Sequence, residues 1–87
     1  MTYAERICTI AEGLDKKSVP YSINHLWEGW QLRFPWTEGD IACHYGTYES
    51  QNDKVESYCF SWDDGDVSVL TCEEAIEKIT AEYENRS

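Results

Sequence analysis

The pentapeptide WQLRF at residues 30–34 indicates the architecture of this chain, because apolar and polar side chains alternate along it. A period of two predicts a β-strand with one buried and one solvated face. Its aromatic and leucine side chains are therefore expected to face a core, whereas Gln31 and Arg33 face outward. Pro35 ends the strand, because proline has no N–H to donate to a strand ladder.

Further strands are predicted on both sides of this one, separated by turn-forming residues. In the longest of them Tyr58, Phe60 and Trp62 are expected to share one face. The segment Asp63-Asp64-Gly65-Asp66 then forms a turn, since Asp and Gly tolerate left-handed backbone. The predicted ranges are Tyr21–Leu26, Ile41–Tyr45, Val55–Trp62 and a short final strand at Val67–Leu70.

A helix is predicted at each end of the chain. Each begins with a capping box, in which a threonine and a later glutamate satisfy free backbone N–H groups. These pairs are Thr2 with Glu5 and Thr71 with Glu74. Apolar residues then recur at spacings of four, three and four, which places them on one helix face. They are Tyr3, Ile7, Ile10 and Leu14 in the first helix, and Cys72, Ile76, Ile79 and Tyr83 in the second.

The predicted order is helix, four or five short strands, helix (α-β-β-β-β-α). Two helices with one apolar face each most simply cover the same face of a sheet. We therefore expect an α+β two-layer sandwich, with the N-terminal and C-terminal helices on one face of a four- or five-stranded antiparallel sheet. At 87 residues the chain is expected to form a single domain, 1–87.

The charge is strongly one-sided, with 17 Asp and Glu against 7 Lys and Arg and a net charge of −10. A field of one sign selects positively charged partners. It argues against direct binding to DNA, RNA or an anionic membrane, which depends on lysine and arginine. The carboxylates are dense late in the chain, and Lys78 is the only basic residue between Asp63 and Glu84. The carboxylates of this segment are Asp63, Asp64, Asp66, Glu73, Glu74, Glu77, Glu82 and Glu84.

The N-terminal residues have no apolar run after a basic start, so no signal peptide is expected. No stretch approaches the ~20 apolar residues that a membrane span needs. We expect a cytoplasmic protein, or one made inside a host cell. In that compartment the cysteines are expected to be reduced, buried and small hydrophobes, and a disulfide framework is the alternative. They are Cys8, Cys43, Cys59 and Cys72.

The outward side chains of the sheet form one candidate site. Alternation along residues 41–45 places Ala42 and His44 on the same outer face as Gln31 and Arg33. One interpretation is an ordinary solvated face, which antiparallel sheets commonly have. The other is a recognition surface centred on Arg33 and His44.

We expect no metal site, no cofactor and no enzymatic activity. Cys43 and His44 are adjacent, so on a strand they point to opposite faces and do not readily share a zinc ion. The segment 63–66 lacks the regular spacing of a calcium loop. No phosphate-binding loop, nucleophile elbow or paired-histidine motif is present. A thiol nucleophile at Cys43 or Cys59 would also need a pocket, a base and oxyanion donors.

The order of elements is similar to that of the double-stranded-RNA-binding domain, which contacts phosphates through basic residues. Here the corresponding late loop and second helix carry carboxylates, so the similarity is one of topology. In size, charge and element order the chain also resembles the small acidic inhibitors made by phages and other mobile elements, such as anti-CRISPR proteins. The segments LWEGWQ (26–31) and DIACHYG (40–46) are similar to a pattern in short prophage proteins. This resemblance implies a protein that blocks an RNA-guided nuclease, in some cases by imitating nucleic acid.

Charge density limits the mimicry hypothesis. Duplex DNA carries one charge per ~1.7 Å of axis. Size scaling gives a folded surface of ~5,300 Å², so evenly spread carboxylates would place only about two or three in an ~800 Å² interface patch. Mimicry therefore requires that the carboxylates cluster, which the run from Asp63 to Glu84 does in sequence.

The leading hypothesis is a non-enzymatic protein that binds and inhibits a nucleic-acid-processing protein, such as a nuclease, by filling its basic groove. Trp36 or Trp27, in predicted loops, would supply an apolar anchor, since tryptophan often dominates interfaces. The alternative is a phage or host adaptor or assembly protein, monomeric or a small homo-oligomer, acting through Gln31, Arg33 and His44. The predicted partner-binding carboxylates are Asp63, Asp64, Asp66, Glu73, Glu74 and Glu77.

Overall fold

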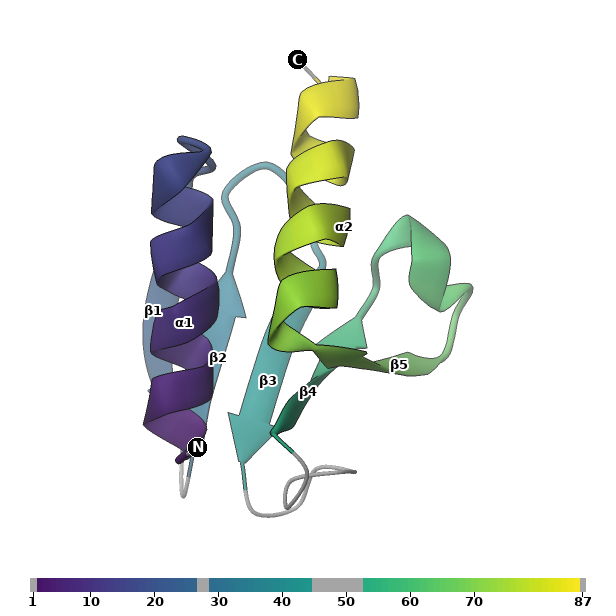
Figure 1. Cartoon of the computed structure of the whole chain (residues 1–87). Coiled ribbons are helices and arrows are strands. Elements are labelled where there is room, and N and C mark those ends of the chain that lie inside the picture. The colour runs from purple at the N-terminus through teal and green to yellow at the C-terminus, as the bar shows by residue number, and fades with distance from the viewer. Residues whose placement is uncertain (1, 27–28, 45–52, 87) are drawn as a thin grey trace.

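A computed structural model of the chain shows two helices and one five-stranded antiparallel sheet, as the sequence predicts (Figure 1). The description covers residues 2–26, 29–44 and 53–86. Neighbouring strands along the chain are also neighbours in the sheet, in the order β1-β2-β3-β4-β5. The elements are α1 (Tyr3–Lys16), β1 (Ser22–Leu26), β2 (Gly29–Arg33), β3 (Asp40–His44), β4 (Lys54–Tyr58), the 3₁₀ turn η1 (Ser61–Asp63), β5 (Val67–Thr71) and α2 (Cys72–Arg86).

Both helices lie side by side on one face of the sheet and run in the same direction (Figure 1). α1 contacts β2 and β3, whereas α2 contacts β4 and β5. This parallel arrangement follows from the five-stranded meander, because an odd number of antiparallel strands returns the chain to the end of the sheet at which α1 begins. As a result, the N-terminal ends of both helices lie at the same end of the molecule.

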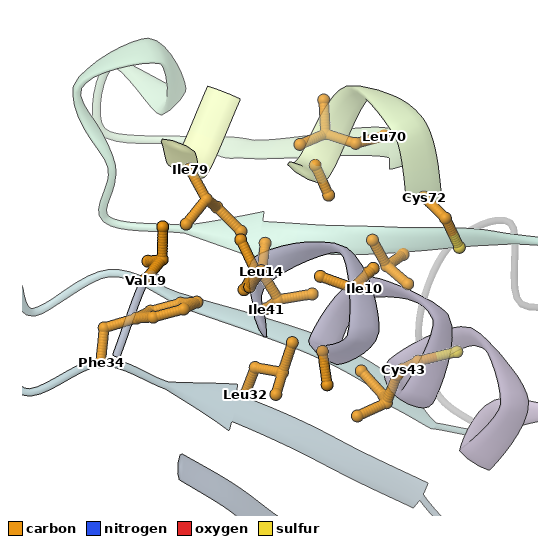
Figure 2. Packing of buried hydrophobic residues seen from close by; sticks show 14 of the residues in the cluster. Ile10, Leu14, Val19, Leu32, Phe34, Ile41, Cys43, Leu70, Cys72 and Ile79 are labelled. Atoms are coloured by element: carbon orange, nitrogen blue, oxygen red, sulfur yellow. The ribbon is translucent and has the colours of Figure 1, made fainter. Parts of the chain in front are cut away.

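The core lies between the helices and the sheet (Figure 2). Ile10 and Leu14 of α1 and Ile79 of α2 are completely buried against Leu32 and Ile41. The inward residues of β2 alternate with Gln31 and Arg33, so the period of two in residues 30–34 correctly predicts which face of the strand is buried. Burial of this apolar surface is the main force that holds the two layers together.

Both predicted capping boxes are present. The Glu5 N–H donates to Thr2 Oγ1 at 3.1 Å, and the Thr2 N–H donates to Glu5 Oε1 at 2.9 Å. The same reciprocal pair joins Thr71 and Glu74, at 3.1 Å and 2.9 Å. The two helix starts predicted from sequence are therefore confirmed.

The predicted strand Val55–Trp62 is too long. The observed strand, β4, ends at Tyr58, because Cys59 has a φ of 64°, which breaks the extended backbone. Phe60 then enters the core, and Trp62 lies in η1, where its ring stacks on that of Phe60 at 4.3 Å. The prediction that Tyr58, Phe60 and Trp62 share one face of a strand is therefore wrong.

The cysteines differ from the expectation in part. Cys43 and Cys72 are buried, as predicted, but Cys8 and Cys59 are exposed, and no disulfide joins any of these four described residues. Cys8 lies on the solvated side of α1, and the left-handed backbone at Cys59 accompanies the exposure of its thiol. Among the described helices, none has the length and apolar character needed to cross a bilayer.

Candidate functional site

Five of the exposed carboxylates of the two helices form an acidic surface, here called the acidic helix face: Glu5, Glu12, Glu73, Glu74 and Glu77. Glu5 and Glu12 are separated by nearly two helical turns, and Glu73 and Glu77 by slightly more than one, so each pair lies on one side of its helix. Because α1 and α2 lie side by side and run in the same direction, both sides belong to one helix layer. Beyond this surface the helix layer carries both signs. Asp15, Lys16 and Lys17 follow within five residues of Glu12, and Glu82, Glu84 and Arg86 lie near the end of α2.

Contact between the helices sets the axial position of these charges. A Cβ at Gly13 would lie 2.4 Å from Ile76 Cδ1, so these two residues are level along the paired helices. Glu12 is therefore level with the first turns of α2, next to Glu73 and Glu77. With a rise of ~1.5 Å per residue, the acidic helix face spans about 13 Å along the axes.

Two of these carboxylates have their conformation fixed by capping. The hydrogen bond from the Thr2 N–H, followed by that from its hydroxyl, lowers the pKa of Glu5 below its ordinary value. The Thr71 N–H and hydroxyl lower the pKa of Glu74 in the same way. Both carboxylates are therefore ionised at neutral pH and have one oxygen bound at the helix start.

Asp63 does not belong to the predicted partner-binding set. It is buried, with 4% of its surface exposed. One carboxylate oxygen accepts a hydrogen bond from Ser57 Oγ at 2.6 Å, and the other accepts from the Phe60 N–H at 3.0 Å. These hydrogen bonds hold η1 against β4. The prediction that Asp63 is a partner-binding surface carboxylate is therefore wrong.

Asp64 and Asp66 are exposed, but they lie away from the acidic helix face. They precede β5, and Glu73 and Glu74 follow it. Five residues of extended strand span about 17 Å. The run from Asp63 to Glu84 is thus one cluster in sequence but separate groups in space, namely Asp64 with Asp66, the first turns of α2, and Glu82 with Glu84. The carboxylates Glu5 and Glu12, which the sequence does not single out, complete the larger group.

Trp36 is a packed residue. Its indole N–H donates to the Pro20 carbonyl at 3.0 Å, and its ring lies 5.4 Å from that of Phe34 and 5.1 Å from that of Tyr83. The Arg86 guanidinium lies 5.8 Å above the ring. Trp36 borders a shallow hollow of about 520 Å³ lined by Pro35, Trp36, Thr37, Glu38, Cys59 and Arg86. Trp27, the other predicted anchor, lies outside the described residues.

The outer face of the sheet carries a polar network that the sequence predicts only in part. Arg33 is exposed and pairs across strands with Asp40, which accepts a hydrogen bond from Gln31 Nε2 at 2.7 Å. In the next strand the Tyr58 hydroxyl donates to Glu56, which is 4% exposed. Burial is the largest cause that raises the pKa of Tyr58. The hydrogen bond to Glu56, the charge of Glu56 and the charge of Asp40 raise this pKa further.

His44 of the predicted sheet-face site pairs with Gly29 across the β2–β3 ladder. Asp40, Glu56 and Tyr58 were missed at this face. The signal that reveals two of them is the alternation in β4, where Glu56 and Tyr58 lie between residues of the buried face.

A buried arginine lies beneath the acidic helix face. Arg6 Nη1 donates to Cys43 Sγ and to the Lys54 carbonyl, each at 3.3 Å, and its Nε lies 3.6 Å from Asp53 Oδ1. The Cys72 thiol donates to the Arg6 carbonyl at 3.8 Å. Burial raises the pKa of both thiols, which argues against a thiolate nucleophile at Cys43. The helical spacing of Arg6 to Tyr3 and Ile10 would have revealed its position on the inner face.

Over residues 2–26, 29–44 and 53–86, no three histidine, cysteine or acidic side chains come together to hold a metal ion. The fold and these surfaces define a small acidic α+β sandwich with one charged helix layer and one polar sheet face. No family model, no curated protein and no solved structure matches this chain.

Proposed function

We propose that this protein is a non-enzymatic inhibitor that binds the basic groove of a nucleic-acid-processing protein through the acidic helix face. The observation that carries the proposal is the parallel packing of α1 and α2, which places five exposed carboxylates within about 13 Å along the paired helix axes. Besides the hydrogen bonds from Thr71, the charges of Lys54 and Lys78 also lower the pKa of Glu74, and the Lys78 ammonium lies 5.5 Å from the Trp62 ring.

The local charge density supports this proposal better than the average density does. The acidic helix face presents its carboxylates at about one per 3 Å of helix axis, given its span of about 13 Å. Duplex DNA presents one charge per ~1.7 Å. The surface thus reaches roughly half the line density of duplex DNA.

The partner is expected to be a nuclease or other protein with a groove lined by lysine and arginine, RNA-guided nucleases among them. Opposite charges across such an interface accelerate association and make it sensitive to salt. The test is competition between this protein and a labelled DNA duplex for a panel of purified DNA-binding nucleases. Fluorescence anisotropy of the duplex, measured at low and high salt, reports displacement.

Two matched triple variants locate the contact. Glu12→Gln/Glu73→Gln/Glu77→Gln removes three charges from the acidic helix face and leaves both caps intact. Glu38→Gln/Asp64→Asn/Asp66→Asn removes three charges elsewhere. We expect the first to weaken displacement at least about ten-fold, ~1.4 kcal/mol, and the second to have little effect. Equal loss in both variants would show that only net charge matters, and no displacement from any nuclease would refute the proposal.

An adaptor or assembly role through the outer sheet face is the second candidate. The observation that favours it is Arg33, an exposed cation on a face whose carboxylates Asp40 and Glu56 are already hydrogen-bonded. This candidate predicts that Arg33→Ala abolishes capture of a partner while the helix-face variant retains it. Retention of every partner by Arg33→Ala would argue against it.

A further inference from the structure

The two edges of the sheet differ in how they are protected. An edge strand presents unpaired N–H and C=O groups to which another strand can add, and charged flanks oppose such pairing. In the described part of the chain no strand pairs with the outer side of β1 or β5. β5 is bracketed by Asp64 and Asp66 before it and by Glu73 and Glu74 after it.

β1, in contrast, lies in an uncharged segment. Residues 18–27 contain no Asp, Glu, Lys or Arg, in a chain with a net charge of −10. Two copies of this protein repel each other over most of their surface, but a β1 edge adds no charge to that repulsion. Neither edge strand contains lysine or proline, the residues that commonly block edges, so the charges before the strand are what distinguishes β5 from β1.

The side chains of β1 leave an apolar group in solvent. Ile23 pairs with Leu32 and so lies on the helix side of the sheet, yet 43% of its surface is exposed. His25, two residues along, lies with its ring 4.5 Å from the Trp30 ring. α1 packs over β2 and β3, so it does not bury Ile23.

We propose that a second copy of this chain binds along β1, antiparallel to it, around a two-fold axis at Asn24. Asn24 is the middle residue of the five in β1, so this register pairs the whole strand with its copy. Ile23 then lies opposite His25 of the second copy, and Ser22 opposite Leu26. The dimer is a continuous sheet with both helix layers on one face, because paired residues of antiparallel strands point to the same side.

This arrangement also suits the charges of α1. The two α1 helices run antiparallel across the axis, so the Glu5 end of each points toward the end of the other that carries Lys16 and Lys17 as well as Asp15. Elsewhere the two copies carry the same sign. Added salt therefore strengthens the dimer by screening repulsion. Binding to a basic partner has the opposite salt dependence, so the two proposals fail or succeed separately.

Sedimentation velocity at low and high salt tests the dimer. We expect a species of twice 10.1 kDa whose fraction rises with salt and with protein concentration. Ile23→Lys should return the protein to monomer, because it places lysine on the edge strand. Val67→Lys, at the similarly exposed residue of β5 (39%), is the matched control and should leave the dimer intact. Both variants change the net charge equally, and circular dichroism verifies their folding.

A register-specific crosslink provides a second test that does not depend on the Ile23 variant. Residues directly opposite each other in antiparallel strands have Cα atoms about 4.5–5.5 Å apart, which suits a disulfide. With Cys8 and Cys59 replaced by serine, Asn24→Cys should form a covalent dimer when treated with oxidised glutathione. Ser22→Cys is the control, because that residue faces Leu26 of the second copy and not itself.

Three results would overturn the proposal. One is a monomeric wild-type protein at every salt and protein concentration, which is also the result expected if β1 accepts a strand from a different protein. The second is a dimer that Val67→Lys disrupts and Ile23→Lys does not. The third is crosslinking of Ser22→Cys as efficient as that of Asn24→Cys.

Discussion

Gly13 of α1 lies directly against Ile76 of α2, where a Cβ on position 13 would fall 2.4 Å from Ile76 Cδ1 and 2.8 Å from Cγ1. The absence of a side chain at Gly13 lets the two parallel helices approach at this point. The contact aligns the charges of the acidic helix face, so it links the packing of the helix layer to its proposed function.

Gly13→Ala is expected to lower the free energy of unfolding by about 1 kcal/mol, although alanine favours helix by a similar amount. The reason is that both Cδ1 and Cγ1 of Ile76 must move. In an Ile76→Ala background the clash is gone, so Gly13→Ala should stabilise by about 0.5–1 kcal/mol. Urea unfolding of the four proteins in this double-mutant cycle measures the coupling. Additive effects would contradict the close contact.

Asp63→Asn is expected to destabilise the protein by about 1–3 kcal/mol, because it weakens two hydrogen bonds to a buried carboxylate. Asp64→Asn is the matched control. Asp64 is exposed with a φ of 49°, a conformation that asparagine tolerates, so little change is expected. Urea midpoints compare the two variants. Equal midpoints would show that the Ser57–Asp63 bond contributes nothing.

The two helix caps should weaken in acid. Hydrogen bonds from Thr2 and Thr71 lower the pKa values of Glu5 and Glu74 below the ordinary 4.5. A lowered folded-state pKa means that the stabilisation is fully present above about pH 4.5 and is lost as the pH falls through the folded-state values.

The measurement for this prediction is the melting temperature between neutral pH and about pH 3, for the wild type and for Glu5→Gln/Glu74→Gln. Glutamine retains an oxygen that can cap and does not titrate in this range. The double variant should therefore lose less stability than the wild type on acidification. Parallel pH profiles for the two proteins would contradict the capping assignment.

Thiol reactivity should divide the cysteines into two pairs. Cys8 and Cys59 are exposed, whereas Cys43 and Cys72 are buried and burial raises their pKa values. Iodoacetamide is expected to modify two thiols rapidly in the folded protein and all four in urea, because the thiolate is the reactive form. Peptide mass spectrometry identifies the sites. Rapid labelling of Cys43 in the folded state would contradict its burial beside Arg6.

Local patterns predicted the secondary structure because they act over a few residues. The alternation in residues 30–34 and the two threonine–glutamate caps depend on neighbours along the chain, and the observed strand and helices match them. The strand after Val55 was predicted too long because the left-handed backbone at Cys59 interrupts it, and nothing in the local alternation signals that change. The packing of Trp36 on Tyr83 also could not be predicted from local patterns, because it joins segments that are far apart in the sequence.

The amino-acid sequence alone established the α+β class, the helix starts and a net charge of −10, which follow from short-range periodicity and composition. Tertiary packing established where that charge lies. It buried Asp63 to hold η1, separated Asp64 and Asp66 from α2 by the length of β5, and packed α1 beside α2 so that Glu12 is level with the first turns of α2. The physical reason is that charges from different helices and strands come together only where those elements pack. That packing depends on apolar faces that are far apart in the sequence and not on the order of acidic residues along the chain.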